Sequence, residues 1–196
     1  VEVAYGSHCA HSQRRNPLKE ASGVKRLCVV FEARCYHKQI LESFQSSQNT
    51  LIFQNNQTMA SPHPSLFIEC ILTKQEESTV DKDQLEKLRL NHNVGVKTRF
   101  LEEFTSLCAA ANEKVLVFSQ FPRPLYLIIN QLKMDLKWTD DEEILYMYGK
   151  VKNRQSLIRR FNDANNQIEI LLASTKACSK GISLVGASSV LLLYVE

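Results

Sequence analysis

Continuous apolar runs in the second half of the chain alternate with segments of helical periodicity, and this alternation restricts the fold more than any other feature. The runs span 114–121, 143–149, 168–174 and 189–195. A strand that is apolar throughout is covered on both faces, which is typical of a parallel sheet. The predicted fold class is therefore α/β, a parallel sheet with helices on both faces.

The segments between these runs are predicted helices. The first, over 96–111, carries an apolar stripe at i, i+3, i+4 spacing, made of Val96, Phe100, Leu101, Phe104, Leu107 and Cys108. The second, over 124–133, begins with Pro124, a residue suited to the first turn of a helix. The third, over 154–163, is predicted to bury Leu157, Ile158 and Phe161 and to expose Arg154, Arg159 and Arg160.

The first half of the chain is less regular. Residues 1–23 are polar and basic with little periodicity, which indicates loop or disorder. Residues 24–96 are predicted to be mostly helical or irregular, and 97–196 form the α/β domain.

Within 24–96, the segment 27–33 is a predicted buried strand. A helix is predicted over 35–45 from the spacing of its apolar residues, Tyr36, Ile40, Leu41 and Phe44. The stretch that follows is polar, and two prolines then forbid a regular helix start before Ser65. The charged segment 81–90 is predicted to be a helix with Asp81 or Asp83 near its N-terminus.

Composition excludes several classes of protein. The six cysteines form no C-x-x-C pair, so neither a zinc motif nor a disulfide framework is predicted, and a reducing compartment fits better. No apolar run approaches the roughly 18 residues of a membrane span. The net charge of +3 is too small to identify a nucleic-acid-binding protein by itself. The chain begins with Val1 and stops directly after an apolar run, and we interpret it as part of a longer protein.

Polar residues follow two of the predicted strands, at the edge of the sheet where ligands of parallel sheets bind. Ser119 and Gln120 end the first strand, and Ser174 and Thr175 end the third. Hydroxyl groups and free backbone N–H groups at such an edge can hold a phosphate. The alternatives are a polar strand end for Ser119 and Gln120, and a helix cap for Ser174, with a short helix over 175–180.

Two segments are similar in sequence to motifs that bind nucleotides. "GISLVGAS", 181–188, matches the phosphate-loop pattern except that Ala187 replaces the lysine, and it leads into a strand instead of opening a helix. "DDEEI", 140–144, is similar to the acidic box that holds magnesium, but it precedes a strand where such a box ends one. We interpret the first as a turn and the second as a solvated turn or cap.

Other single residues favour structural roles. His63 lies between two prolines without a metal-ligand partner at suitable spacing, and the segment with Lys137 and Trp138 fits packing as well as binding. Arg154, Arg159 and Arg160 form either a solvated helix face or part of a basic track. The sequence contains no arrangement that defines a catalytic or metal site.

Taken in order, these segments resemble the second RecA-like lobe of SNF2-type, ATP-dependent DNA translocases. "VLVFSQF" looks like helicase motif IV, and Gly149, Arg154 and Phe161 match a G-x4-R-x6-F segment. "LLASTKACSKGISLVGAS" looks like motif V, in a version similar to the plant CLASSY group, which is linked to RNA-directed DNA methylation. The resemblance covers about 24–196, with 24–96 similar to the end of the first lobe and the helical segment between the lobes.

The resemblance implies roles for individual residues. Ser119, Gln120 and Arg154 would lie near a DNA backbone, and Ser174 and Thr175 would contact a DNA phosphate. Gly181 would lie near the nucleotide cleft. ATP and Mg²⁺ would bind between two lobes in the complete parent protein. This chain contains neither the phosphate loop nor the acidic box of the first lobe and stops before motif VI, so alone it is expected not to hydrolyse ATP.

The implied function is part of a chromatin-remodelling translocase in the nucleus, acting in siRNA-linked gene silencing. Its implied partners are DNA, nucleosomes, the silencing RNA polymerase machinery and the missing first lobe, and no membrane is involved. The alternative is a non-enzymatic, lobe-like remnant that only binds protein or nucleic acid. A stand-alone nucleotide-binding enzyme is a third hypothesis, which rests on "GISLVGAS" alone.

Overall fold

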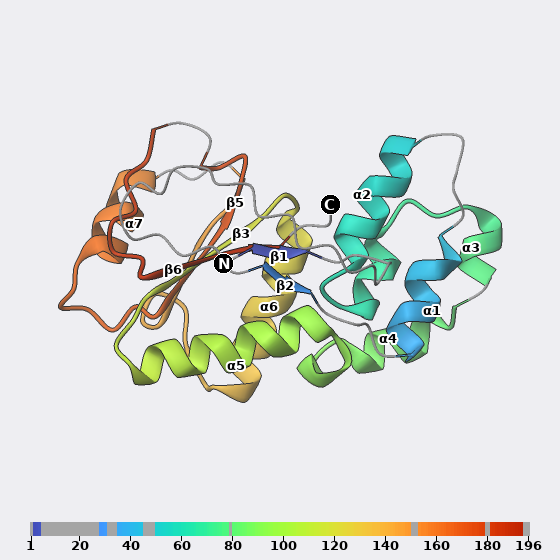
Figure 1. The fold of residues 1–196 in the computed structure, drawn as a ribbon, viewed down its shortest axis with the longest axis horizontal. Helices are drawn as coiled ribbons and strands as arrows, with labels where there is room; N and C mark the ends of the chain where they lie inside the picture. The colour runs from blue at the N-terminus through green and yellow to red at the C-terminus, as the bar shows by residue number, and fades with distance from the viewer. Residues whose placement is uncertain are drawn as a thin grey trace.

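The computed structural model describes residues 2–4, 28–30, 35–44, 50–78, 80–149, 153–178 and 181–193. Figure 1 shows a sheet with its covering helices and, beside it, a group of helices from the first half of the chain. No helix within the described ranges is long and apolar enough to cross a bilayer.

The second half of the chain alternates strands and helices, as its apolar runs predict. Its elements are α5 (Val96–Ala110), β3 (Val115–Ser119), α6 (Pro122–Asp135), β4 (Ile144–Met147), α7 (Arg154–Asn162), β5 (Ile170–Ser174) and β6 (Ser189–Leu193). These four strands are parallel in the order β6-β3-β5-β4. The α/β fold class is therefore confirmed.

Two short strands extend this sheet beyond β6. β1 (Glu2–Ala4) pairs with β6 and β2 (Cys28–Val30) pairs with β1, both in parallel. β2 lies within the predicted strand 27–33, whereas β1 lies in the segment 1–23 that was expected to be loop or disorder. The physical reason for the difference is the open edge of β6, whose backbone groups accept another strand. The rest of 1–23 lies outside the described residues.

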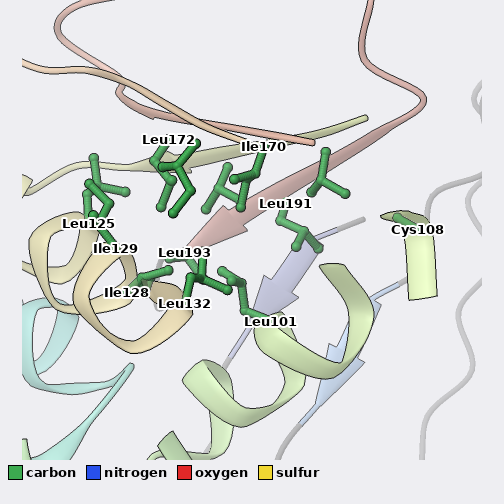
Figure 2. Packing of buried hydrophobic residues seen from close by; sticks show 13 residues of the cluster. Leu101, Cys108, Leu125, Ile128, Ile129, Leu132, Ile170, Leu172, Leu191 and Leu193 are labelled. Carbon is green, nitrogen blue, oxygen red and sulfur yellow. The ribbon is translucent and has the colours of Figure 1, made fainter. Parts of the chain in front are cut away.

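The sheet separates two apolar layers. Val115, Val117, Ile170 and Leu172 point to the face that α5 and α6 cover. Figure 2 shows Ile170 and Leu172 packed with residues such as Leu101 and Ile128. Leu116, Leu145, Met147, Leu171 and Ala173 point to the opposite face, which Phe161 of α7 and the segment after β5 cover. Because side chains alternate along a strand, β3, β4 and β5 each supply both layers, whereas the buried residues of β6, Leu191 and Leu193, belong to the first layer.

The apolar stripe on α5 is only partly correct. Leu101 and Cys108 are buried, but Leu107 is 71% exposed. Leu107 lies six residues, or about 120° around the helix, from Leu101, and therefore faces away from the sheet. Lys97, Thr98 and Thr105 occupy buried positions instead. Trp138 is half-buried and packs on this same layer, so its role is packing.

The first half of the chain forms a small helical group with its own core. Its elements are α1 (Cys35–Ser43), α2 (Thr50–Ala60), the 3₁₀ helix η1 (Pro64–Glu69), α3 (Lys74–Ser78), α4 (Lys82–Leu88) and the 3₁₀ helix η2 (His92–Val94). The apolar spacing of α1 is confirmed, because Ile40, Leu41 and Phe44 are buried. Asp81 caps α4 by accepting hydrogen bonds from the backbone N–H groups of Asp83 and Gln84.

Helix α2 was not predicted, because two of the three residues that it buries, Asn56 and Thr58, are polar. Asn56 is 5% exposed, and its side chain makes two hydrogen bonds with the backbone of Ile71, from Nδ2 to the carbonyl (2.6 Å) and from the Ile71 N–H to Oδ1 (3.0 Å). These bonds compensate the burial of the amide. A pattern of apolar spacing gives no sign of such a helix.

The helical group contacts the α/β domain at Gly95, just before α5. A Cβ atom at this position would lie 2.5 Å from the Pro62 carbonyl oxygen and 2.6 Å from Cδ2 of His63, so only glycine permits this close approach. Lys97, two residues further, is buried and donates a hydrogen bond from Nζ to Ser61 Oγ (3.1 Å). Burial lowers the pKa of Lys97 to about 7.

Candidate nucleic-acid interface

The ends of β3 and β5 meet at one edge of the sheet. Ser119 and Ser174 are register partners, and the Thr175 N–H donates a hydrogen bond to the Ser119 carbonyl (3.0 Å). The two serines are buried, whereas Gln120 and Thr175, which follow them, are exposed. The structure therefore brings together four residues that the sequence placed near DNA, with the two exposed side chains available to a ligand.

The serine hydroxyl groups serve the local backbone. Ser119 Oγ accepts a hydrogen bond from the Phe121 N–H (3.3 Å), and Ser174 Oγ accepts one from the Ala177 N–H (3.2 Å). These bonds match the polar strand end and the cap that we considered as alternatives. They stabilise the turns that follow β3 and β5, and thereby position Gln120 and Thr175.

The short helix expected after Ser174 is not present in the described residues. Residues 175–178 form turns, in which the N–H groups of Ala177 and Cys178 donate to the Ser174 carbonyl at 2.9 and 3.2 Å. A single turn closes too few hydrogen bonds to offset the cost of helix nucleation. The prediction of a helix here was wrong.

Gln120 lines a cavity of about 510 Å³ that lies between the β3–α6 connection and α2. The wall from α2 carries amide and hydroxyl side chains, including Gln54, Asn55 and Thr58, with Leu51 and Phe53 beside them. Such a wall offers both hydrogen-bond donors and acceptors. The carboxyl edge of the sheet therefore faces a polar surface of the helical group.

The arginines of α7 do not form a uniform exposed face. Arg154, the first residue of α7, is half-buried, which contradicts its predicted exposure. Its guanidinium opposes the rise that burial causes in the pKa of the Cys178 thiol, so its charge acts on the turn after β5. Arg160 instead makes an ion pair with Asp141 (2.8 Å), and Arg159 is exposed. Of these residues, Arg154 is the one that lies toward the edge formed by Ser174 and Thr175.

The segment "GISLVGAS" forms turns before β6. Gly181 is exposed and has a φ of +40°, a conformation that favours glycine. Gly186 is fixed by proximity to the end of α7, because a Cβ atom there would lie 2.6 Å from the Phe161 carbonyl oxygen and 2.8 Å from Cα of Asn162. The Gly186 N–H donates to Asn162 Oδ1 (3.0 Å), and Asn162 Nδ2 donates to the Ser183 carbonyl (2.9 Å). Both glycines therefore serve chain geometry, as expected for turns.

We expect Gly186→Ala to reduce the free energy of unfolding by about 1–3 kcal/mol, because the new methyl group forces the segment away from α7. The same displacement breaks both hydrogen bonds of Asn162. Urea unfolding of Gly186→Ala, Asn162→Ala and the double variant should therefore give strongly non-additive losses. Gly181→Ala combined with Asn162→Ala is the control and should be additive. If the losses are additive for Gly186→Ala with Asn162→Ala as well as for the control pair, Gly186 does not act through its contact with Asn162.

The acidic segment before β4 is a turn. Thr139 donates a hydrogen bond from its N–H to Glu143 Oε2 (2.8 Å), and the Asp141 N–H donates to the Ile144 carbonyl (3.0 Å). Lys133 and Arg160 neutralise Asp140 and Asp141. This arrangement confirms a solvated turn at the opposite end of the strand from the carboxyl edge.

His63 has a structural role. Its Nδ1 accepts a hydrogen bond from the Ser65 N–H (3.2 Å), and its Nε2 donates one to the Asn91 carbonyl (3.0 Å). The imidazole therefore caps η1 and joins it to the segment before η2. Another histidine, His92, lies with Glu102 and Asp135 in a cluster that no local spacing in the sequence indicates.

Comparison with known proteins identifies the class of the α/β domain. Residues 96–195 match the model of the helicase conserved C-terminal domain, and the chain belongs to this family. Within it, the chain is similar to SNF2 domain-containing proteins of Arabidopsis thaliana. It is 44% identical to CLASSY 3 over 183 residues and 42% identical to CLASSY 4 over 195 residues, which are 88% and 96% of this chain.

The aligned parts are 13% of CLASSY 3 and 17% of CLASSY 4, so the chain spans a small part of these relatives. Among solved structures, it resembles the Sulfolobus solfataricus SWI2/SNF2 ATPase C-terminal domain, with a TM-score of 0.52 and 17% identity. That alignment covers 82% of this chain and 69% of the other and supports the fold. Together these likenesses do not favour a degenerate remnant.

Proposed function

We propose that the chain supplies the second lobe of an ATP-dependent DNA translocase, and that Gln120 and Thr175 lie along the DNA backbone. The observation that carries this proposal is the register pair of Ser119 and Ser174, which sets these two exposed polar residues on adjacent strand ends. Neutral amide and hydroxyl donors contact phosphates without regard to base sequence. Arg154, whose charge acts on the turn after β5, supplements the contact.

ATP and Mg²⁺ belong to the complete two-lobed protein in this proposal. The described residues contain no loop that cradles phosphate, and the acidic residues 140–143 form a turn paired with Lys133 and Arg160. We therefore propose that the first lobe supplies the groups that bind the phosphates and the Mg²⁺ ion. Gly181, whose missing side chain faces open space, is proposed to lie beside the cleft that the two lobes form.

The similarity to CLASSY 3 and CLASSY 4 supports a finer proposal for the complete protein. We propose that it acts in the nucleus on DNA and nucleosomes, together with the silencing RNA polymerase machinery, in RNA-directed DNA methylation. Loss of the gene should reduce both small-RNA abundance and DNA methylation at shared loci. Unchanged methylation would exclude this role while leaving DNA translocation open.

We expect Gln120→Ala and Thr175→Val in the complete protein each to weaken DNA binding about 3- to 10-fold, which corresponds to the loss of one ordinary hydrogen bond of about 1 kcal/mol. The loss should be the same for unrelated duplex sequences, because the contact is to the backbone. Binding is measured by fluorescence anisotropy at several salt concentrations.

Gln167→Ala is the matched control for Gln120→Ala. Gln167 is also an exposed glutamine, but it precedes β5 at the opposite edge of the sheet. Its substitution should leave DNA binding unchanged. An equal loss in Gln167→Ala, or a loss confined to one DNA sequence, would contradict a backbone contact at the carboxyl edge.

A further inference from the structure

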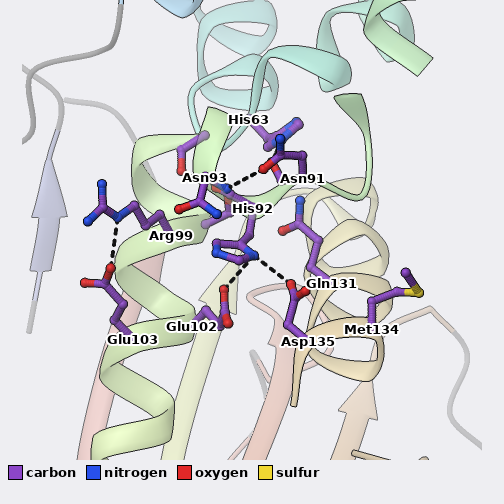
Figure 3. Close-up of polar contacts among 12 residues, drawn as sticks. His63, Asn91, His92, Asn93, Arg99, Glu102, Glu103, Gln131, Met134 and Asp135 are labelled. Atoms are coloured by element: carbon purple, nitrogen blue, oxygen red, sulfur yellow. Dashed lines mark hydrogen bonds and ion pairs between the residues drawn. The ribbon is translucent and has the colours of Figure 1, made fainter. Parts of the chain in front are cut away.

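Three side chains with metal-binding atoms converge where the helical group meets the α/β domain. They are His92 of η2, Glu102 of α5 and Asp135, the last residue of α6. His92 Nδ1 lies 2.7 Å from Asp135 Oδ2 and 2.9 Å from Glu102 Oε2. Figure 3 shows the imidazole of His92 directed at both carboxylates. The candidate ligand atoms all lie within 4.8 Å of one another.

A proton on His92 cannot satisfy both carboxylates. The Nδ1–H group forms a hydrogen bond with Asp135 Oδ2. Glu102 Oε2 is close to the same nitrogen but buried, and it receives no hydrogen bond from any residue that the structure describes. A buried carboxylate oxygen without a donor is costly. A cation, unlike a single N–H group, can contact all three ligand atoms simultaneously.

The charges in the cluster also favour a divalent cation. Two carboxylates face one imidazole, so even a protonated His92 leaves a net negative charge. Asp135 lies at the C-terminus of α6, where the helix dipole repels an anion and attracts a cation. The next carboxylate on α5, Glu103, is paired with Arg99 (2.9 Å), so Glu103 does not add to this charge.

We propose that His92, Glu102 and Asp135 form a binding site for a divalent transition-metal ion, with Zn²⁺ as its ligand. His Nδ1 and two carboxylate oxygens are common zinc donors, and a water molecule would complete a tetrahedron. Donor atoms about 2.0–2.2 Å from zinc are about 3.3 Å apart in a tetrahedron. The observed separations of 2.7 and 2.9 Å need to widen by about half an ångström, which small side-chain rotations supply.

The ligand set separates zinc from the hard cations. Mg²⁺ and Ca²⁺ prefer six or more oxygen donors, whereas imidazole suits zinc and its neighbours in the first transition series. Bound zinc would join η2, α5 and α6 at one point. Gln131, one turn before Asp135, already joins α6 to the segment between α4 and η2, because it donates a hydrogen bond to the Arg89 carbonyl (3.0 Å). The ion would therefore fix the helical group against the α/β domain, independently of the function proposed above.

The test is calorimetric titration of the chelator-treated chain with Zn²⁺. We expect one equivalent to bind with a micromolar dissociation constant and to raise the thermal unfolding midpoint. Glu102→Gln and Asp135→Asn, which keep the side-chain shape, should each weaken binding more than about tenfold. Glu103→Gln removes the adjacent carboxylate of α5 and should bind like the unaltered chain. Circular dichroism establishes that each variant is folded.

Titration with Co²⁺ distinguishes this site from zinc bound to cysteine. Coordination by nitrogen and oxygen gives only weak visible bands, whereas thiolate coordination adds an intense near-ultraviolet band. The weak bands, lost in Glu102→Gln, are expected. The proposal is overturned if the folded Glu102→Gln and Asp135→Asn variants bind zinc as tightly as the unaltered chain, if the bound cobalt shows thiolate coordination, or if no zinc binds at all.

Discussion

Lowering the pH from about 7 to about 5 is expected to destabilise the chain by about 2 kcal/mol for each of two buried histidines, His37 and His63. Both side chains are almost fully buried in the helical group, at 1% and 0% exposure. Burial lowers the pKa of each to about 4, from an ordinary value of 6.5. Both imidazoles are therefore neutral in the folded chain at neutral pH.

The hydrogen bonds of His37 explain why its protonation is unfavourable. Nε2 donates to the Ala60 carbonyl (3.0 Å), which places the single proton of the neutral ring on this atom. Nδ1 is buried and has no hydrogen-bond partner among the described residues. A second proton would add a buried N–H group without an acceptor, and the Lys97 ammonium would repel the new charge.

The hydrogen bonds of His63 also make its protonation unfavourable, but for a different reason. Its Nδ1 accepts the Ser65 N–H, so protonation of this atom removes the cap of η1. Besides burial, the charges of His37, Arg89 and His92 oppose protonation, and the hydrogen bond to the Asn91 carbonyl favours it. The neutral ring fits its surroundings, and the charged ring does not.

The direction of the effect follows from proton binding. Between pH 4 and 6.5 the unfolded chain binds more protons at these histidines than the folded chain does. Stability therefore falls as the pH is lowered through this window, and the loss is complete below about pH 4. Urea unfolding followed by circular dichroism at about pH 7 and about pH 5 measures the difference.

The control is a double variant, His37→Gln with His63→Asn. Glutamine keeps a donor for the Ala60 carbonyl and asparagine keeps a cap for η1, but neither titrates in this range. The double variant should lose about 4 kcal/mol less than the unaltered chain over the same pH interval, whatever its stability at pH 7. Equal losses in both proteins would show that the two histidines do not govern the acid response.

The α/β domain could be predicted from the sequence because each of its strands and helices has a pattern of apolar residues that is recognisable within a short segment. Each strand is a continuous apolar run, and β3, β4 and β5 each supply both layers of the core. The order of strands and helices then leaves few alternatives, since parallel strands need crossover helices. The same reasoning placed Ser119 and Ser174 at one edge, where they are register partners.

The helical group was less predictable because polar side chains are buried beside its apolar core. Asn56, His37, His63 and Lys97 are buried and compensated by backbone and side-chain hydrogen bonds between segments far apart in the sequence. Apolar spacing does not reveal such positions. The cluster of His92, Glu102 and Asp135 could not be predicted for a similar reason, since its members come from three elements and Asp135 lies far from the other two in the sequence. By contrast, spacing alone suggested burial of Leu107, which is exposed because it lies about 120° around α5 from the buried Leu101. Arg154 is half-buried although its spacing predicted exposure.

The second large effect is expected at Phe161, where substitution by alanine should reduce the free energy of unfolding by about 3–5 kcal/mol. Phe161 is fully buried beneath the sheet, against a layer that includes Leu116, Leu145 and Met147. The Lys114 Nζ lies 5.9 Å from the centre of its ring and donates to its carbonyl (3.1 Å). Removal of the ring therefore leaves a cavity between α7 and the sheet. It also removes the contact between the Lys114 ammonium and the aromatic ring.

Leu157→Ala is the matched control, because Leu157 lies one turn earlier on α7 and packs on the same layer but is only half-buried. We expect it to cost about 1–2 kcal/mol in the same urea titration, with the dependence on urea concentration unchanged in both variants. Phe161→Leu should give an intermediate loss, since leucine fills part of the cavity. A free energy of unfolding that rises from alanine to leucine to phenylalanine at position 161 would show that the volume of this side chain determines how strongly α7 is held on the sheet. A loss at Phe161→Ala no larger than that at Leu157→Ala would mean that α7 contributes little to the stability of the domain.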